Sequence, residues 1–206
     1  GACLGIPAMT AHRCVFADGP VNGQTIFVTG GAGRVGFYAI QWAKQAGARV
    51  ITTASSEQAK QHCIAAGADL VVNHNDEGMI ASILDFTQGQ KIDRIVEVEF
   101  GANLDKSLAL LKVGGVIASY SSTQEPEPKL PFKQMMFMDL TLRMVIVYAM
   151  PEQAKRDAIA DITQALENKQ LQHRIHAQFG LDDIALANTD IEKGGFYGCV
   201  VLDIEE

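Results

Sequence analysis

The sequence contains no apolar run of the roughly 20 residues that a membrane-spanning helix requires. Its longest candidate, 140–150, is interrupted by Arg143 and followed by Pro151, so we expect no membrane crossing. Clusters of Lys and Arg are absent as well, and 17 basic residues stand against 24 acidic ones, for a net charge of −7. A chain of this charge repels phosphate backbones on average, which argues against nucleic-acid binding.

Cysteine is scarce and scattered. The four residues Cys3, Cys14, Cys63 and Cys199 form no C-x-x-C pair, which argues against a structural zinc site and against a disulfide scaffold. The first eleven residues also lack the basic segment and apolar stretch of a signal peptide. We therefore expect free thiols, no metal ligands and a cytoplasmic location.

What the sequence does contain is a regular alternation of short β-branched runs with longer segments of helical spacing. Most of the runs are continuously apolar, as strands covered on both faces must be. The pattern predicts an α/β fold of the Rossmann type, a doubly wound parallel sheet with helices on both faces. Six strands are expected, at 25–29, 49–53, 70–72, 92–98, 116–120 and 142–148.

The segments between these strands carry helix signals. Ala39 and Ala43 belong to a stripe of small residues on a helix that should end at Gly47. Ser55 followed by Gln58 is a capping-box pattern that opens the next helix. Later helices are expected at 103–111 and 151–168, and an exposed proline-rich loop at 124–131. The chain is expected to end with a strand at 174–179, a helix at 182–193 and a strand at 199–204.

The most informative segment joins the first strand to the first helix of the sheet. Its glycines Gly31, Gly33 and Gly36 satisfy G-x-G-x-x-G, and Gly30 begins the alternative spacing G-x-x-G-x-x-G. Such a turn lets the backbone approach a pyrophosphate closely, and the helix amino terminus supplies N–H groups and partial positive charge. Arg34 adds a cation there. The residues predict a dinucleotide-binding site, whereas a plain glycine-rich turn would be the structural alternative.

The end of the second strand indicates which dinucleotide. NAD-binding proteins usually place Asp or Glu there, because its carboxylate accepts a hydrogen bond from the ribose 2′-hydroxyl. This chain has Thr53 and then Ser55 and Ser56, with Lys60 one turn further on. Hydroxyls and a cation suit a 2′-phosphate better, which favours NADP(H). In the alternative interpretation, Ser55 only caps its helix and Lys60 is a solvated surface charge.

Several short segments besides the glycine turn are distinctive. They are the opening Gly1-Ala2-Cys3-Leu4-Gly5-Ile6-Pro7, Thr52-Thr53-Ala54, Val71-Val72-Asn73-His74, Gly114-Gly115 and Gly198-Cys199-Val200-Val201-Leu202. In these segments, and over nearly its whole length, the chain resembles the zeta-crystallin-type NADPH:quinone oxidoreductases, which are zinc-free medium-chain dehydrogenases/reductases.

The same resemblance implies a division of the chain. It suggests a lead-in helix and linker (1–23) from an absent GroES-like domain, an NADP-binding Rossmann domain (24–170) and a C-terminal tail (171–206) that returns to the catalytic domain in the family. The chain is then expected to be a fragment without activity of its own.

The resemblance also extends the predicted site. It implies that the pyrophosphate is lined by Ala32, Gly33, Arg34 and Val35, and that the adenosine 2′-phosphate lies near Ser55, Lys60 and His74. The path from the adenosine to the nicotinamide would be lined by Asn103, Tyr120, Ser121, Ser122 and Thr123. The nicotinamide itself would be bordered by Val145, Ile146 and Val147. No catalytic side chain and no metal ligand are expected. Glu97 and Glu99 bring two carboxylates to this crevice, and the sequence assigns them no role.

The reaction implied is hydride transfer from NADPH to a quinone. A 2-enoyl or alkenal reductase, or a non-catalytic NADPH-binding module, remains open at this point. The apolar segment 142–148 is expected to be an edge strand that pairs with its copy in a homodimer. In the alternative, the helix at 151–168 covers that strand.

Overall fold

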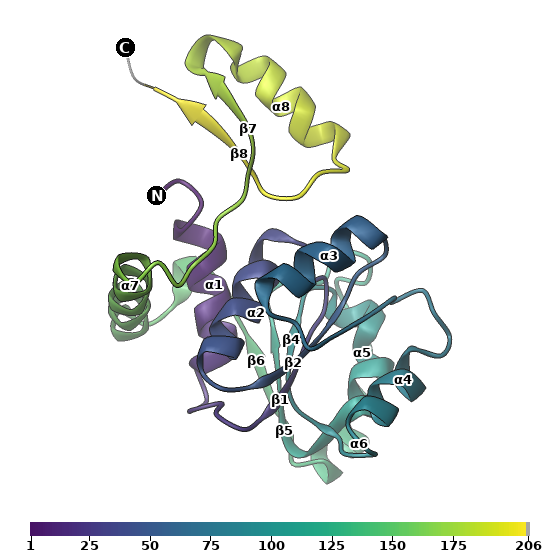
Figure 1. The fold of residues 1–206 in the computed structure, drawn as a ribbon. Helices are drawn as coiled ribbons and strands as arrows, with labels where there is room; N and C mark the ends of the chain where they lie inside the picture. Colours follow the sequence, from purple (N-terminus) through teal and green to yellow (C-terminus); the bar gives the residue numbers. More distant parts are fainter. Residues whose placement is uncertain (205–206) are drawn as a thin grey trace.

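The computed structural model describes residues 1–204 and contains a six-stranded parallel sheet with helices on both faces (Figure 1). The strand order is β3-β2-β1-β4-β5-β6. The chain therefore winds outward from β1 to β3, crosses back to the other side of β1, and continues outward to β6. This is the Rossmann-type fold that the alternation of apolar runs and helical segments predicts.

The strands of this sheet are β1 (Thr25–Val28), β2 (Arg49–Thr53), β3 (Leu70–Val72), β4 (Ile92–Glu97), β5 (Leu111–Ser119) and β6 (Thr141–Met144). The helices are α1 (Gly5–Phe16), α2 (Arg34–Gln45), α3 (Glu57–Ala66), α4 (Met79–Phe86), α5 (Phe100–Leu110), α6 (Phe132–Phe137), the 3₁₀ turn η1 (Val147–Ala149) and α7 (Glu152–Glu167). The tail consists of β7 (Ile175–Gly180), the 3₁₀ turn η2 (Leu181–Asp183), α8 (Ile184–Lys193) and β8 (Cys199–Asp203).

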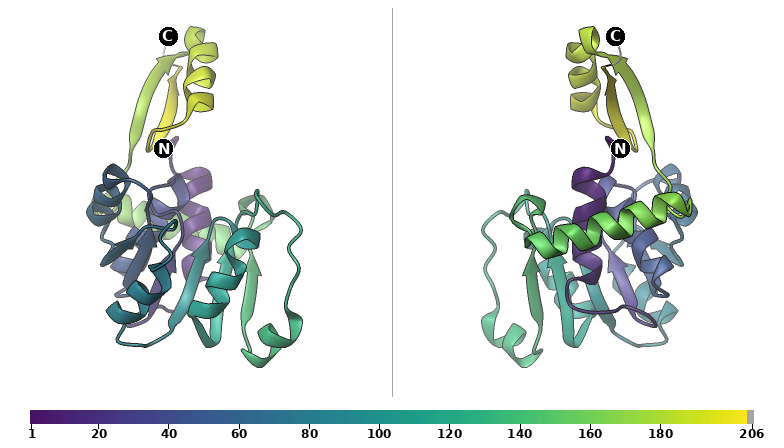
Figure 2. Two further views of the ribbon diagram at one scale, coloured as in Figure 1. Left: turned by 90° about the vertical axis from the view of Figure 1, so that its right-hand side faces the viewer. Right: turned by 90° about the vertical axis from the view of Figure 1, so that its left-hand side faces the viewer.

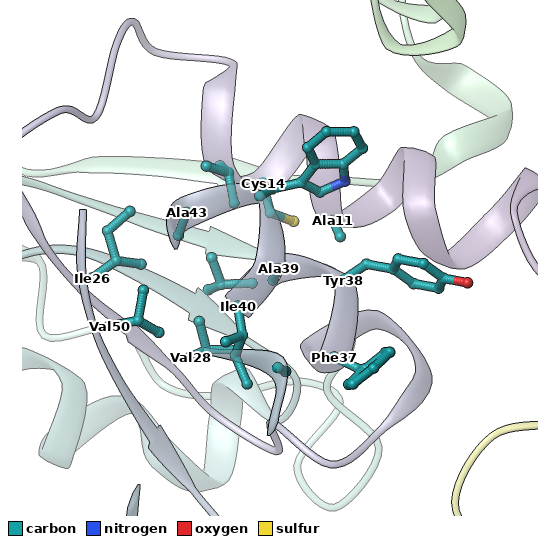
Figure 3. Packing of buried hydrophobic residues seen from close by; sticks show 14 of the residues in the cluster. Ala11, Cys14, Ile26, Val28, Phe37, Tyr38, Ala39, Ile40, Ala43 and Val50 are labelled. Atoms are coloured by element: carbon teal, nitrogen blue, oxygen red, sulfur yellow. The ribbon is translucent and has the colours of Figure 1, made fainter. Parts of the chain in front are cut away.

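One hydrophobic core joins the sheet to α1, α2, α3 and α7. Ala39 and Ala43 of α2 are fully buried. Because their side chains are small, α2 lies close both to β1 and to Ala11 of α1 (Figure 3). Helix α7 crosses the outer side of α1 on this face, in front of it in the right-hand view of Figure 2. The small-residue stripe expected from the sequence is therefore the packing surface of α2.

A second core lies on the opposite face of the sheet, beneath α4, α5 and α6. Ile95 of β4 and Ile117 of β5 are fully buried there, as is Ile83 of α4. Burial of each such side chain stabilises the fold by about 1.5–3 kcal/mol. Because each face of the sheet has its own core, the strands read as continuous apolar runs.

The last strand of the sheet is shorter than expected. The sequence suggested a strand at 142–148, but β6 ends at Met144 and the turn η1 follows. The reason is that its partner β5 ends at Ser119, which pairs with Met144. After Val145 donates its N–H to the Ser119 carbonyl at 2.7 Å, the chain has no further strand beside it.

Two helices also begin at residues other than those expected. Ser56, rather than Ser55, caps α3, because its hydroxyl accepts the Ala59 N–H at 3.1 Å. The strand ladder extends past β2, where Ala54 donates to the Val72 carbonyl, and this delays the helix by one residue. Helix α5 begins at Phe100 instead of residue 103, because the buried Phe100 ring is already part of the second core.

An ion-pair cluster joins the segment after α1 to the sheet. The Asp18 carboxylate pairs with Arg94 of β4 at 3.1 Å and with Arg143 of β6. Arg94 is 2% exposed and also donates to the Cys14 carbonyl at 2.9 Å. The hydrogen bond from Arg143 lowers the pKa of the Asp18 carboxyl. Burial acts in the opposite direction, and the hydrogen bond from Arg94 lowers the pKa further. The cluster therefore connects residues far apart in the sequence.

The tail forms a separate two-stranded parallel sheet, β7-β8, with α8 beside it, and this unit projects from the main body (Figures 1 and 2). The expected strand, helix and strand are therefore present. Several contacts connect the tail to α2 and α3. Among them, Tyr38 Oη lies 2.9 Å from His173 Nδ1, the Arg174 guanidinium lies 3.8 Å from the centre of the Phe37 ring, and Tyr197 Oη lies 3.0 Å from Ser56 Oγ.

Candidate functional site

The glycine turn lies between the carboxyl end of β1 and the amino terminus of α2, as the sequence predicts. Gly30 has a φ of +64°, in the left-handed region that favours glycine. A Cβ added to Gly31 would lie 2.0 Å from Thr52 Oγ1, and one added to Gly36 would lie 2.3 Å from the Gly30 carbonyl oxygen. These positions therefore exclude larger residues for lack of space.

The amino terminus of α2 has no side-chain cap. Its N-cap residue is Gly33, and no side chain bonds to the first N–H groups of the helix. The first N–H groups of any helix lack partners within the helix, so here they face outward as donors. Arg34 is exposed beside them. The turn therefore forms a cradle of backbone donors that suits a pyrophosphate.

A cleft of about 400 Å³ adjoins this turn at the carboxyl ends of β1, β2 and β4. Four residues of the predicted cofactor site, Gly30, Thr53, His74 and Asn103, line it together. Thr53 is tied to the turn, because its hydroxyl accepts the Gly30 N–H at 2.8 Å. The cleft is also lined by Phe27, Thr29, Asn75, Met79, Val98, Glu99, Ala102, Lys106, Ser107 and Gln124.

Glu97 organises the floor of this cleft. Its side chain is fully buried, and Oε1 accepts hydrogen bonds from Thr29 Oγ1 at 2.8 Å, Asn103 Nδ2 at 2.9 Å and the Glu99 N–H at 2.7 Å. Its Oε2 accepts from Ser107 Oγ at 3.3 Å. Within residues 1–204 no cation pairs with Glu97, so neutral donors alone hold this carboxylate. It fixes the orientation of Asn103 toward the cleft.

Glu99 has a different task. Its carboxylate accepts the Thr123 hydroxyl at 2.7 Å and the Gln124 N–H at 2.9 Å. Partial burial alone would raise the pKa of the Glu99 carboxyl, but these hydrogen bonds, with others from backbone N–H groups of the same loop, lower it. Glu99 therefore remains ionised and holds the loop after β5 against the end of β4.

A second hollow, of about 380 Å³, lies at the ends of β5 and β6. Four more residues of the predicted site line it: Tyr120, Ser121, Ser122 and Val145. Burial raises the pKa of the Tyr120 hydroxyl, so this group stays neutral. Apolar residues complete the walls, namely Phe100, Pro126, Pro128, Leu130 and Met144, together with Ser119.

The remaining residues of the predicted site lie elsewhere. Ala32, Gly33 and Arg34 border a small hollow against the tail, lined also by Arg174 and Cys199. Thr123 bonds Glu99 beside the first cleft, while Ile146 is exposed and Val147 is buried.

Ser55, Ser56 and Lys60 do not line the cleft. The Ser56 hydroxyl is engaged with Ala59 and Tyr197. The structure thus brings eight of the nineteen predicted residues into two hollows and leaves these three residues outside both.

Sequence reasoning missed Thr29, Lys106 and Ser107 as parts of the site. Lys106 and Ser107 follow Asn103 by three and four residues, so they lie on the same face of α5. That spacing was a usable signal once Asn103 had been chosen. Thr29 is the last residue before the glycines, and its role depends on Glu97, 68 residues later.

Residues 1–204 contain no group of three or more His, Cys, Asp or Glu side chains arranged to hold a metal ion. Across the same residues, no helix combines the length and apolar character needed to cross a lipid bilayer.

Comparisons with known proteins identify relatives of this chain. The chain is 30% identical over 206 residues to quinone oxidoreductase of Pongo abelii and 29% identical to that of Homo sapiens, in each case covering 98% of this chain and 61% of the relative. The mycobacterial protein Rv1454c, solved in complex with NADPH, matches with a TM-score of 0.85 at 25% identity, covering 98% of this chain and 63% of that one.

The chain therefore spans about 61% of the length of these curated relatives. A family model described as zinc-binding dehydrogenase matches residues 35–164, which is more than half of the sequence. The chain belongs to the zinc-binding dehydrogenase family and is homologous to the quinone oxidoreductases.

Proposed function

We propose that this chain is the NADP(H)-binding part of a zinc-independent oxidoreductase that transfers hydride to a quinone. One observation carries the proposal: the uncapped glycine turn borders the first cleft, and the second hollow follows along the same edge of the sheet. A dinucleotide has the matching form, two nucleoside halves joined by a pyrophosphate. When bound, NADPH supplies the hydride.

The first cleft would hold the adenosine half. Its floor is polar and rigid, because Glu97 orients Asn103 and Ser107 while Thr53 holds the Gly30 amide. A site whose side chains are already oriented spends little binding energy on ordering them. The backbone from Ala32 to Gly36 would then receive the pyrophosphate, with Arg34 as the nearby cation.

The second hollow would hold the nicotinamide half. Tyr120, Ser121 and Ser122 bring polar groups to one side, and Val145 and Met144 provide an apolar wall. In this arrangement the chain orients the nicotinamide ring and excludes water, and no acidic or basic side chain acts on the substrate.

The rest of the active site would come from another part of the protein. The quinone oxidoreductases are longer than this chain, and β7, α8 and β8 expose Ile175, Leu181 and Leu186 by more than half of their surface. We propose that the tail, residues 171–206, returns to a catalytic domain that covers these side chains, and that residues 1–23 lead in from the same domain. The isolated chain would then bind the cofactor without turnover. A cytoplasmic location accords with three of the four cysteines being buried as free thiols.

The edge of the sheet supports a homodimer. Strand β6 has β5 on one side only, and Met144, Ile146 and Tyr148 beside it are 63%, 59% and 71% exposed. Antiparallel pairing of two copies of β6 would satisfy its free backbone groups and cover these side chains. Sedimentation analysis tests this pairing, and a monomer at high concentration would contradict it.

Calorimetric titration with NADPH and NADH tests cofactor binding. We expect NADPH to bind more tightly than NADH, and Gly36→Ala to abolish binding of both, because its Cβ would displace the Gly30 carbonyl. Gly5→Ala is the matched control, since a Cβ there meets no atom within 4 Å. Circular dichroism verifies that both variants fold. Unchanged NADPH binding by folded Gly36→Ala would contradict the proposed cradle.

Activity of the longer protein tests the reaction. We expect NADPH oxidation with a quinone acceptor, faster than with a 2-enal, and insensitive to a metal chelator. Faster reduction of the 2-enal would assign the protein to the alkenal reductases instead. NADPH binding without turnover of any acceptor would indicate a binding module.

A further inference from the structure

Two of the four cysteines, Cys3 and Cys199, lie together although almost the whole chain separates them in the sequence. Their thiols form a hydrogen bond with each other. Cys3 belongs to the turn before α1, where Leu4 donates to the Gly1 carbonyl at 3.0 Å, and Cys199 is the first residue of β8. The start of the chain lies at the foot of the tail unit (Figures 1 and 2). The two thiols therefore meet where the main body and the tail join.

Backbone contacts hold Cys199 in this position. Its N–H donates to the Arg174 carbonyl at 2.9 Å. The preceding residue, Gly198, has a φ of +110°, and a Cβ added there would lie 2.7 Å from the same carbonyl oxygen. Glycine therefore allows β8 to begin directly against the residue that precedes β7. The foot of the tail thus fixes the place of the Cys199 thiol.

The two thiols differ in their access to solvent. Cys3 is 6% exposed, whereas Cys199 is half-buried and lines the small hollow at the amino end of α2 together with Arg34. A small oxidant that enters this hollow reaches Cys199 first. The other two cysteines, Cys14 and Cys63, are completely buried in the main body. They therefore offer an oxidant no competing thiol.

The surroundings of Cys199 keep the pair reduced under ordinary conditions. Burial and the hydrogen bond with Cys3 raise the pKa of the Cys199 thiol to about 11, and the charge of Arg34 lowers it only in part. Because the thiolate is the reactive form, oxidation of Cys199 is slow at neutral pH and requires a sustained oxidant. Once Cys199 is oxidised, Cys3 is close enough to react with it before further oxidation occurs.

We propose that Cys3 and Cys199 form a reversible disulfide, a redox-sensitive tether between the segment before α1 and the tail. Hydrogen peroxide is the oxidant. The Cys199 sulfur attacks one peroxide oxygen and the O–O bond breaks, which gives a sulfenic acid and one water molecule. The Cys3 sulfur then attacks the Cys199 sulfur, the S–S bond forms, and the hydroxyl leaves as a second water molecule. The two thiols lose two electrons and two protons, which the peroxide gains.

The tether would hold the tail against the main body. A cross-link between residues so distant in sequence removes much of the freedom of states in which the two parts separate. Formation of the disulfide does not require the proposed function. Under that function, however, the bond joins the two segments, 1–23 and 171–206, that connect this chain to the catalytic domain. Oxidation would then restrain both connections at once.

Peroxide treatment of the 206-residue chain tests the disulfide. Mass spectrometry of unreduced peptides should find Cys3 joined to Cys199, and the number of reactive thiols in the unfolded protein should fall by two. Dithiothreitol should restore both thiols. Cys3→Ser should prevent the cross-link and leave a sulfenic acid on Cys199, which dimedone labels. Cys14→Ser, at a buried thiol outside the pair, is the matched control and should retain the cross-link.

Hydrogen exchange tests the tether. In the oxidised chain, exchange over β7 and β8 should slow by about tenfold or more, because opening of the tail no longer releases it from α1. Dithiothreitol should reverse this slowing, and peroxide should not cause it in Cys3→Ser. Circular dichroism verifies that the variants fold. If a variant does not fold, the peptides of the unaltered chain still decide whether the disulfide forms.

Three results would overturn the inference. The first is that all four thiols remain free under peroxide that fully oxidises added glutathione. The second is a cross-link between two copies of the chain in place of the one within a chain, seen as a dimer on a non-reducing gel. The third is a disulfide between Cys3 and Cys199 with unchanged exchange in β7 and β8, which would show that the bond does not restrain the tail.

Discussion

The six-stranded sheet and the tail unit β7-α8-β8 differ in how they are stabilised, although both alternate strand and helix. In the sheet, Ile95, Ile117 and Glu97 are completely buried, and even the buried carboxylate has every oxygen bonded. In the tail, Ile175 and Leu186 are more than half exposed. The comparison shows that the sheet has its own buried core, whereas the tail is held by contacts with α2 and α3 and leaves large apolar side chains exposed.

Removal of the Glu97 carboxylate should have the largest effect on the sheet. Glu97→Leu leaves the Thr29 hydroxyl, the Asn103 amide and the Glu99 N–H without their acceptor, so we expect a loss of about 3–5 kcal/mol in unfolding free energy. Glu97→Gln keeps an acceptor at Oε1 and should lose about 1 kcal/mol. Urea unfolding followed by circular dichroism measures both. Equal losses in the two variants would show that these hydrogen bonds contribute little.

Asp18→Asn should cause the next largest loss of stability, because it leaves the buried Arg94 without its counter-charge. We expect a loss of about 2–3 kcal/mol at neutral pH. The pKa of Asp18 is lower in the folded state, so its contribution is full above the unfolded value near 4 and disappears as the pH falls through the folded pKa. Unfolding free energy should therefore depend less on pH below about 4 in Asp18→Asn than in the unaltered chain. The exposed Asp105→Asn is the control, and an unchanged acid dependence in Asp18→Asn would refute this role.

Arg174→Ala should affect the tail and not the sheet. It removes the guanidinium over Phe37 and the 2.7 Å hydrogen bond to the His62 carbonyl, a local loss of about 1 kcal/mol. Hydrogen exchange should accelerate over 175–203, with little change in β1 and β4. Arg49→Ala, whose guanidinium lies 5.8 Å from the Phe86 ring, is the control in the main body. Faster exchange throughout the sheet would mean that the two regions unfold together.

Tyr197→Phe should have the smallest effect. It removes the hydroxyl 3.0 Å from Ser56 but keeps the ring against His62. We expect a change below about 0.5–1 kcal/mol, confined to exchange at residues 196–199. Tyr148→Phe, at a hydroxyl on a 71% exposed residue, is the control. A loss as large as that of Arg174→Ala would show that Tyr197 is a principal attachment of the tail.

The parts of the fold that were predictable from sequence are those fixed by local chemistry. Six apolar runs gave six strands, and the glycines at 30, 31, 33 and 36 gave the turn, because each of these signals depends on neighbours in the chain. The limits of β6 and the cap of α3 were not predictable in this way. They depend on where β5 and β3 stop pairing, which no local pattern records.

The residues of the candidate site show the same difference between local and long-range signals. Gly30, Thr53, His74 and Asn103 were expected in one cleft and they lie there, because strand ends converge at one edge of a parallel sheet. Glu97 looked like an unexplained carboxylate in an apolar strand. Its donors are Thr29, the residue after β1, and Asn103 of α5, so its role became visible only with the fold assembled. Lys106, by contrast, could have been found from the sequence, because it follows Asn103 by three residues on the same face of α5.

The strand order also bears on synthesis. Strand β1 pairs on one side with β2, about 24 residues later, but on the other side with β4, where Ile26 faces Arg94. While the ribosome is still adding residues 29–91, that second edge of β1 has nothing to bond to, and its apolar side chains are open to other chains. The part of the sheet formed by β1, β2 and β3 is thus most vulnerable to aggregation before β4 is made and pairs with β1, and a delay in translation over that interval would prolong the exposure.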